Sequence, residues 1–254
     1  MAEIVRKSLI NRSALGFWCV NAVQGCSHGC RYPCHAFLNA QRFGRVRDYG
    51  EWCVPRPVSN ALDLLDKELR KRSRPDRIHL SLTTDPFMMG QPEICELSIR
   101  IIERINHCGI PCTILTKGIL PIELGDHGRF HPGNIYGISL VSCNESFRKR
   151  WEPAASTYAK RIESLRVLHE RGCLTRVQIE PYPTPTVVEQ DVRLILCEVG
   201  FVDSVYFSGW NYNTWVVRST NTSVYYASQA RIVRRFCCER GIDCEVGCER
   251  MPNG

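Results

Sequence analysis

The sequence predicts an α/β fold in which strands and helices alternate along a single domain of 254 residues. Short apolar runs of strand length recur, and each precedes a helical pattern or, once, the Gly- and His-containing connection 119–133. Polar residues follow each of these runs. Such alternation implies a parallel sheet with right-handed crossovers. The length suits one domain, since single α/β barrels often reach this size.

Six strand-like runs define six successive units. They cover residues 17–23, 77–82, 111–116, 134–141, 174–179 and 202–207. Helices are predicted over 58–72, 187–199 and 224–238. A further helix is predicted around the apolar residues of 94–105, and one long helix is predicted to carry the apolar residues of 162–168. Residues 1–15 are predicted to be a polar lead-in, 38–56 a loop or irregular segment, and 242–246 a terminal strand. We expect one domain over 1–254, with its core at about 16–240 and a cysteine-containing tail at 241–254.

Composition narrows the class of protein. No apolar run approaches the roughly 20 residues of a membrane span, and the N-terminal residues lack the apolar core of a signal peptide. We therefore expect a cytoplasmic protein with no membrane partner. Fifteen cysteines in a reducing compartment argue against a disulfide framework and favour a metalloprotein, although packing of small buried residues also explains many of them.

The net charge of +7 is concentrated in basic clusters at 67–74, 148–150 and 231–235. Attraction to phosphate is the main non-specific term in nucleic-acid binding, so a nucleic-acid partner is one interpretation. Solvated helix faces are the other interpretation.

The cysteine loop, residues 25–37, contains Cys26, Cys30 and Cys34 in the spacing Cys-x3-Cys-x3-Cys. Its two glycines permit the open backbone angles that wrapping around one metal centre requires. We expect Arg31 and His28 to add positive charge, which favours thiolates. Three thiolates leave one corner of a four-iron cluster open for a substrate or cofactor. A zinc or purely structural cysteine loop is the alternative, although structural zinc usually takes four protein ligands.

This loop resembles that of the radical S-adenosylmethionine (SAM) enzymes. Their usual pattern is Cys-x3-Cys-x2-Cys with an aromatic residue just before the last cysteine, whereas here Pro33 stands between Tyr32 and Cys34. The surrounding residues are most similar to the spore photoproduct lyase-like branch. Motifs of that branch follow in the same order from about residue 24 to about 185: Thr84-Asp85-Pro86-Phe87, Thr116-Lys117-Gly118, Glu152-Pro153-Ala154-Ala155-Ser156 with Arg161, and Pro181-Tyr182-Pro183.

The resemblance implies a partial (β/α)6 barrel of TIM type with parallel strands. It implies an enzyme of lyase or oxidoreductase type with one [4Fe–4S] cluster, held by Cys26, Cys30 and Cys34. Reductive cleavage of SAM would give methionine and a 5′-deoxyadenosyl radical that removes a hydrogen atom from the substrate. The cofactors supply this chemistry, while the protein positions and shields them. A reduced electron donor such as flavodoxin or ferredoxin is the expected partner.

Candidate SAM contacts come from the polar residues that follow the strands, because ligands collect at the carboxyl ends of parallel strands. Lys117 is expected to pair with the SAM carboxylate. The remaining candidates are Thr83, Thr84 and Asp85 for the ammonium group, Ser139 and Glu180 for the ribose or sulfonium region, and Tyr32 for the adenine. For Lys117 and Asp85 the alternative is a surface ion pair or a turn.

The sequence leaves the substrate open. Trp210, Tyr212 and Trp215 would suit a base-stacking nucleic-acid substrate, or would close the barrel mouth. A protein or peptide substrate is a third interpretation, and a non-catalytic metal- or nucleic-acid-binding protein is the rival class. Also open are the oligomeric state, a hydrogen-donor role for Cys53 or Cys143, and a second metal centre at Cys237, Cys238, Cys244 and Cys248.

Overall fold

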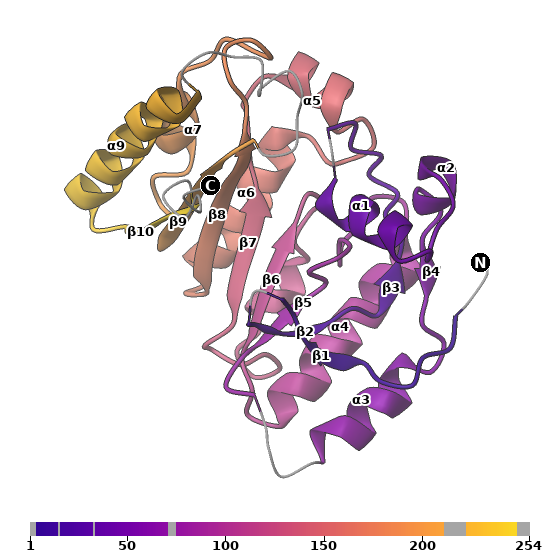
Figure 1. Cartoon of the computed structure of the whole chain (residues 1–254). Coiled ribbons are helices and arrows are strands. Elements are labelled where there is room, and N and C mark those ends of the chain that lie inside the picture. The colour runs from indigo at the N-terminus through magenta and orange to yellow at the C-terminus, as the bar shows by residue number, and fades with distance from the viewer. Residues whose placement is uncertain (1–3, 15, 33, 71–74, 211–221, 248–254) are drawn as a thin grey trace.

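The computed structural model describes residues 4–14, 16–32, 34–70, 75–210 and 222–247. Within these residues the main sheet has eight strands in the order β1-β2-β5-β6-β7-β8-β9-β10 (Figure 1). Their bounds are β1 Ile10–Arg12, β2 Trp18–Val20, β5 Ile78–Leu80, β6 Cys112–Thr116, β7 Ile135–Ser139, β8 Leu174–Tyr182, β9 Ser204–Gly209 and β10 Asp243–Val246. A small second sheet pairs β3 (Val23–Gln24) with β4 (Arg56–Pro57).

The strand pairing confirms the predicted α/β class with a parallel sheet. Strands β2, β5, β6, β7, β8 and β9 pair in parallel in that order, which matches the six predicted strands. Strand β10 adds a further parallel strand beside β9, so the sheet extends into the predicted tail. The exceptions to parallel pairing are β1, which runs antiparallel to β2, and the antiparallel β3–β4 pair.

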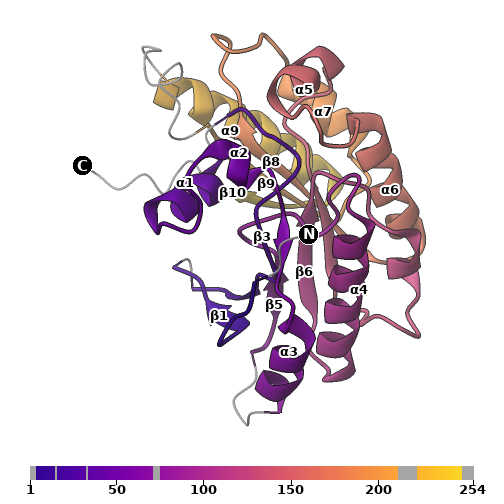
Figure 2. The same cartoon turned by 90° about the vertical axis from the view of Figure 1, so that its right-hand side faces the viewer.

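Helices cover the outer face of the main sheet. Figure 2 shows α3, α4 and α6 on one side of the sheet and α1 on the other. The helices of the described residues are α1 His35–Arg42, α2 Tyr49–Trp52, α3 Ala61–Leu69, α4 Pro92–His107, α5 Glu145–Trp151, α6 Tyr158–Glu170, α7 Val192–Glu198 and α9 Thr222–Arg240, with the 3-10 turn η1 Ile122–Gly125. None of these helices is both long and apolar enough to cross a membrane.

Local signals explain where the long helices begin and which side they bury. Helix α4 starts with Pro92 in its first turn, where the missing N–H costs nothing. Ile94, Ile101 and Ile105 of this helix are fully buried, as a helical repeat of apolar residues predicts. Helix α6 is capped by Thr157, whose hydroxyl accepts a hydrogen bond from the backbone N–H of Lys160.

Two of the sequence predictions for the connecting segments are wrong, and a third is incomplete. The lead-in 1–15 contributes β1, a polar edge strand that has no apolar alternation to predict it. The segment 38–56 contains most of α1 and all of α2, so it is partly helical rather than irregular. The long helix predicted before β8 is α6, which carries the predicted apolar positions, but a further helix, α5, precedes it across a turn that contains Glu152.

The strand register places the polar strand ends along one edge of the sheet. Leu80 pairs with Ile114, and Thr116 at the end of β6 pairs with Ile138. Ser139, which ends β7, pairs with Gln178 of β8. The residues that follow β5, β6 and β7 therefore reach the same carboxyl edge, where ligands of parallel α/β folds bind.

Candidate metal and cofactor site

The cysteine loop lies between β3 and α1 and is held by backbone hydrogen bonds. The N–H of Cys26 donates to the carbonyl of Trp52 at 2.9 Å, and the N–H of Arg31 donates to that of Trp151 at 2.8 Å. Gly25, with φ +92°, turns the chain into the loop. These contacts fix the loop against α2 and against the end of α5.

Replacing Gly25 with alanine is expected to lower the free energy of unfolding by about 2–4 kcal/mol. A Cβ atom there would lie 2.6 Å from the Trp52 carbonyl oxygen and 2.9 Å from that of Val54, in addition to the left-handed backbone. Gly16→Ala is the matched control, because Gly16 has φ +85° and open space around its Cβ position. Denaturant unfolding should show the larger loss for Gly25→Ala, and equal losses would contradict the close approach.

Burial of neighbouring thiols raises their pKa values. Burial raises the pKa of Cys26 well above its ordinary value, and the charges of Asp85 and Cys30 raise it further. Burial also raises the pKa of Cys30 to about 12, with Glu152 as the next cause. The charge of Cys34 raises the pKa of both thiols, so the three sulfur atoms are mutual neighbours. A bound metal reverses this effect, because a coordinating thiol is deprotonated.

The loop fits the chemistry of an iron–sulfur cluster. Thiolates are the usual ligands of such clusters, and three lie together on this loop. The hydroxyls of Ser27 and Thr84 are buried and have no hydrogen-bond partner among the described residues, which leaves two polar groups for a ligand. In the described part of the chain, no three His, Cys, Asp or Glu side chains are arranged to hold a single metal ion, so the three thiols do not form a site for one ion such as zinc, whereas a four-iron cluster binds each thiolate at a separate iron.

Glu152 is the centre of a buried polar network that connects the cysteine loop to the sheet. Its carboxylate accepts hydrogen bonds from the Tyr32 hydroxyl at 2.7 Å and from Arg161 Nη2 at 2.6 Å. Lys117 Nζ lies 3.4 Å from the same carboxylate. Burial alone raises the carboxyl pKa, but the charges of Lys117 and Arg161 outweigh it and hold the pKa of Glu152 at about 2. Sequence reasoning placed Glu152 and Arg161 in a family motif without recognising them as site residues.

Lys117 brings three of the predicted cofactor residues together. Its amino group donates to the Ser139 hydroxyl and lies 5.7 Å from the centre of the Tyr32 ring. Ser139 Oγ donates in turn to the carbonyl of Glu180 at 3.3 Å. Burial raises the pKa of the Glu180 carboxyl, which also accepts from Gln178 Nε2 at 2.7 Å. The ends of β6, β7 and β8 thus share one polar region.

Asp85 uses its carboxylate oxygens for contacts within the protein. It accepts hydrogen bonds from the Phe87 N–H at 2.9 Å, the Thr116 hydroxyl at 2.6 Å and the Lys117 N–H at 2.7 Å. His28 Nδ1 lies 3.4 Å from the same carboxylate. Asp85 therefore ties the turns after β5 and β6 to the cysteine loop.

His28 is a buried neutral residue rather than a source of positive charge. Burial lowers its pKa, and the backbone N–H of Met89 donates to its Nε2 at 3.3 Å. This arrangement places the ring proton on Nδ1, facing Asp85. The expectation that His28 favours thiolates by its charge is wrong, because desolvation disfavours the imidazolium form.

The two threonines after β5 have different environments. The N–H and the hydroxyl of Thr83 both donate to Asn21 Oδ1, at 3.0 and 2.9 Å. The Thr84 hydroxyl has no hydrogen-bond partner in the described structure. Ser81, with φ +57°, turns the chain at the end of β5 and so directs both residues. Of the two hydroxyls, that of Thr84 is the one left for a ligand.

Tyr32 is buried under an aromatic cluster at the end of β9. Its ring meets Trp210 edge-on with 5.5 Å between ring centres, and Trp210 meets Trp151 edge-on at 5.1 Å. The indole N–H of Trp210 is buried without a hydrogen-bond partner among the described residues. The other two predicted aromatics, Tyr212 and Trp215, lie outside the described residues.

Comparisons with known proteins agree with this geometry. No family model matches the chain. An uncharacterized protein of Methanocaldococcus jannaschii is 25% identical over 193 residues, which cover 76% of this chain and 70% of that protein. Spore photoproduct lyase in complex with a dinucleoside spore photoproduct superposes with a TM-score of 0.67 at 14% identity, over 95% of this chain and 80% of that one. A mutant lyase with bound AdoMet and the same dinucleoside gives 0.67 at 13% identity, over 96% and 80% of the two chains.

A third structure extends the likeness beyond the lyase. The radical SAM methyltransferase TsrM from Kitasatospora setae, with cobalamin and a [4Fe–4S] cluster bound, superposes with a TM-score of 0.51 at 14% identity. The match covers 76% of this chain and 34% of TsrM. The chain has the radical SAM fold. This result confirms the predicted partial barrel, and it confirms the spore photoproduct lyase-like branch at the level of the fold.

One further thiol of this radical SAM fold lies beside the cysteine loop. Cys53 follows α2 and hydrogen-bonds the Tyr49 side chain. Burial raises its pKa, and the charge of Cys34 raises it further, so these two sulfur atoms are neighbours. Cys143, by contrast, is exposed in the turn after β7.

The C-terminal cysteines lie away from this loop, at the β10 edge of the radical SAM fold. The side chains of Cys237 on α9 and Cys244 on β10 hydrogen-bond each other. This contact lowers the pKa of the more exposed Cys244 and raises that of the buried Cys237. Cys238 is exposed, and Cys248 lies outside the described residues. A metal centre shared by all four cysteines therefore stays a prediction.

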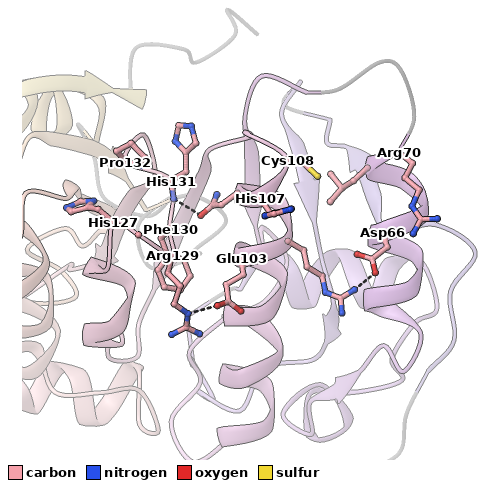
Figure 3. A pocket seen from close by; sticks show the side chains of 14 residues that line it. Asp66, Arg70, Glu103, His107, Cys108, His127, Arg129, Phe130, His131 and Pro132 are labelled. Atoms are coloured by element: carbon pink, nitrogen blue, oxygen red, sulfur yellow. Dashed lines mark hydrogen bonds and ion pairs between the residues drawn. The ribbon is translucent and has the colours of Figure 1, made fainter.

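A hollow of about 830 Å³ lies at the opposite edge of the radical SAM fold (Figure 3). The ends of α3 and α4 and the segment 127–132, which precedes β7, line it. Ion pairs of Arg104 with Asp66 and of Arg129 with Glu103 cross its walls. None of the cluster cysteines or candidate SAM residues borders this hollow, so it is separate from the candidate site.

Proposed function

We propose that this protein is a radical SAM enzyme whose cysteine loop holds a [4Fe–4S] cluster through Cys26, Cys30 and Cys34. The observation that carries the proposal is the position of this loop at the carboxyl edge of a parallel sheet, joined through Tyr32 to the Glu152–Lys117 network. When bound, the cluster and SAM supply reductive cleavage of the sulfonium bond and a 5′-deoxyadenosyl radical. Similarity to folds that hold AdoMet and a [4Fe–4S] cluster supports the assignment.

The side chains at this edge have distinct roles in the proposal. Lys117 holds its ammonium group beside Ser139 and Glu152 at the boundary of the buried network and pairs with the SAM carboxylate. Thr84 offers its unused hydroxyl to the SAM ammonium group, next to Thr83. Asp85 acts indirectly, because a carboxylate with four donors around it has little remaining acceptor capacity.

The other candidates face the rest of the cofactor. Ser139 and Glu180 contribute polar groups for the ribose or sulfonium region, and Tyr32 contributes an aromatic surface for the adenine. Trp210 covers Tyr32 and excludes water, which protects a reactive intermediate from side reactions. Burial raises the pKa of the Glu180 carboxyl, so the buried site disfavours its charged form.

We propose a nucleic-acid substrate and a reaction of lyase or oxidoreductase type. The net charge of +7 supports this choice, because phosphate attraction grows with such charge. The buried indole N–H of Trp210 has no hydrogen-bond partner among the described residues and offers a donor to a base bound beside the aromatic cluster. The dinucleoside bound to spore photoproduct lyase supports the same class of substrate.

Anaerobic reconstitution with iron and sulfide, followed by dithionite and SAM, tests the enzymatic assignment. We expect iron and sulfide to be incorporated and 5′-deoxyadenosine to form. A protein that retains zinc, takes up no iron and cleaves no SAM would instead be a barrel with a structural metal loop. Oligonucleotides added to the same assay should change the yield of 5′-deoxyadenosine if nucleic acid is the substrate.

Replacing Lys117 with methionine is expected to weaken SAM binding about 10- to 100-fold, the equivalent of the roughly 1.5–3 kcal/mol of a hydrogen bond to a charged group. Methionine keeps an unbranched stem but removes the ammonium group. Calorimetric titration of the reconstituted protein with SAM measures the change. Lys160→Met, at an exposed position of α6, is the control. An unchanged SAM affinity in Lys117→Met would show that Lys117 serves only the buried Glu152.

A further inference from the structure

The last helix and the last strand bring two thiols together at the β10 end of the sheet. Helix α9 ends in a turn of the Schellman type, in which the N–H of Gly241 donates to the carbonyl of Cys238 at 3.4 Å. The N–H of Ile242 donates to the carbonyl of Cys237 at 3.0 Å, and Gly241 has φ +67°, as this turn requires. The chain then enters β10, which lies beside α9 (Figure 1). This closed turn sets Cys237 of the helix against Cys244 of the strand.

The two side chains are in direct contact and differ in exposure. Both are free thiols, and their side chains hydrogen-bond each other. Cys237 is completely buried, whereas Cys244 is half-buried. A small reagent can therefore reach Cys244 from solvent, while Cys237 is shielded from it.

Hydrogen bonding and charge favour the thiolate form of the more exposed member. The hydrogen bond from Cys237, together with the charge of Arg234, outweighs burial and lowers the pKa of Cys244 to about 7. The same contact raises the pKa of Cys237. The thiolate is the attacking form in thiol–disulfide exchange, and the best attacking thiol has a pKa near the ambient pH. Cys244 therefore suits the attacking role, and Cys237 suits the role of the second thiol.

Two other interpretations explain this pair less well. Structural zinc usually takes four protein ligands, and the described residues add no third His, Cys, Asp or Glu ligand to the pair. Packing explains a buried cysteine such as Cys237, because a free cysteine behaves as a small apolar residue. Packing does not explain why its contact on the neighbouring strand is a second, half-buried thiol, since an apolar side chain would pack there as well.

We propose that Cys237 and Cys244 form a reversible disulfide that links α9 to β10. The oxidant is a low-molecular-weight disulfide of the glutathione type. The Cys244 thiolate attacks one sulfur atom of this disulfide, whose S–S bond breaks and releases one thiolate. The Cys237 thiol then loses its proton and attacks the Cys244 sulfur atom, which releases the second thiolate. The protein has lost two protons and two electrons, and the reagent has become two thiols.

The disulfide constrains a strand that is paired on one side only. Among the described strands, β10 pairs with β9 and ends the main sheet. Glu245 of β10 also pairs with Arg176 of β8 at 2.9 Å. A disulfide removes open conformations of the segment that it closes, so we expect oxidation to slow the local opening of β10.

Treatment of the full chain with oxidised glutathione, followed by alkylation and tryptic mass spectrometry, tests the disulfide. Trypsin cleaves after Arg235, Arg240 and Arg250, so Cys237 and Cys244 fall in separate peptides. We expect the wild type to give these two peptides joined, with fragment ions that assign the link to Cys237 and Cys244. Reduction should separate them again. Failure of the two peptides to join, or a link through other cysteines, would overturn the proposal.

Three variants separate the roles of the two thiols. Cys237→Ala should stop at the mixed disulfide between Cys244 and glutathione, because the second thiol is missing. Cys244→Ser should form no product at Cys237, because that thiol is buried. Cys238→Ser removes the exposed neighbouring thiol and is the control, which should form the link as the wild type does. A link that persists in Cys244→Ser, or that disappears in Cys238→Ser, would contradict the assignment.

Amide hydrogen exchange measures the effect of the link on the fold. The β10 amides should exchange at least about threefold more slowly in the oxidised than in the reduced wild type. Cys244→Ser treated with the same reagent should show no such change, which separates the effect of this link from reactions at other thiols. Equal exchange of β10 in the two wild-type states would refute the constraint on the strand. None of these measurements requires a cluster or SAM, so their outcome is independent of the proposed function.

Discussion

Cys34→Ala is expected to lose nearly all bound iron and to reduce SAM cleavage by more than about 100-fold. Changes one shell beyond a metal already cost 10- to 100-fold in affinity or activity, and this change removes a ligand itself. The fold should persist, because Cys34 precedes α1 as its N-cap without any side-chain hydrogen bond to that helix. Iron and sulfide content, 5′-deoxyadenosine yield and far-UV circular dichroism measure the three expectations.

The neighbouring Cys53 provides the control for this variant. Cys53→Ala removes a thiol from the same region, close enough for the charge of Cys34 to raise its pKa. We expect it to retain iron and to cleave SAM. If Cys53→Ala lost its iron while Cys34→Ala kept it, the third ligand would be Cys53, and the extra residue between Tyr32 and Cys34 would have displaced the family's ligand. Unfolding of Cys34→Ala would instead favour a structural zinc loop.

Glu152→Gln is expected to lower the free energy of unfolding by about 3–5 kcal/mol, the usual cost of removing one member of a buried ion pair. Arg161 is completely buried, and its Nη2 lies 2.6 Å from the carboxylate that this change neutralises. Lys117 loses the same partner. Glutamine keeps the shape and can still accept from the Tyr32 hydroxyl, so the loss reports on charge rather than on packing. Denaturant unfolding measures it.

A matched control comes from Glu145, whose side chain is 41% exposed and pairs with Arg148. Glu145→Gln should cost less than Glu152→Gln, because Arg148 is buried but the Glu145 carboxylate itself stays partly solvated, which weakens the pair. Equal losses of unfolding free energy in Glu145→Gln and Glu152→Gln would mean that burial does not make the Glu152–Arg161 pair more stabilising than a partly exposed pair.

The same carboxylate predicts how stability changes with pH. An unfolded glutamate titrates near pH 4.3, whereas the folded pKa of Glu152 is about 2. A depressed folded pKa adds stability that is fully present above the unfolded pKa and is lost as pH falls toward the folded one. The contribution is about 3 kcal/mol. Between about pH 4.3 and 2, Glu152→Gln should therefore lose less stability than the wild type. Equal losses of unfolding free energy in the two proteins over this range would contradict the low pKa of Glu152.

Much of the parallel sheet could be predicted because its strands are apolar runs with polar ends. The runs that became β5, β6 and β7 have this form, and their spacing predicted their order. Strand β1 could not be predicted, because it is polar and forms only by pairing with β2 at an edge. Helices α1 and α2 were missed for a related reason: they are short, and Ala40 and Trp52 form them by packing on the cysteine loop.

The candidate site was predictable in its parts but not in its connections. The cysteine spacing, Lys117 and Ser139 were visible as motifs and strand ends. The role of Glu152 was not, because its partners Tyr32 and Arg161 lie on either side of it in sequence, one of them 120 residues away. The neutral state of His28 depends on burial by other segments, which spacing along the chain does not reveal.

The hydrogen bond between Tyr32 and Glu152 also determines when, during synthesis, the cysteine loop can be anchored. A ribosome adds roughly 5–20 residues per second, so the 120 residues between them take about 6–24 s to emerge. During that interval Cys26, Cys30 and Cys34 are already outside the ribosome, while the side chain that anchors their loop does not yet exist. Nascent chains of this protein therefore display three accessible thiols for seconds, and under the proposed function iron would have to be delivered after residue 152 is made, or the thiols protected until then.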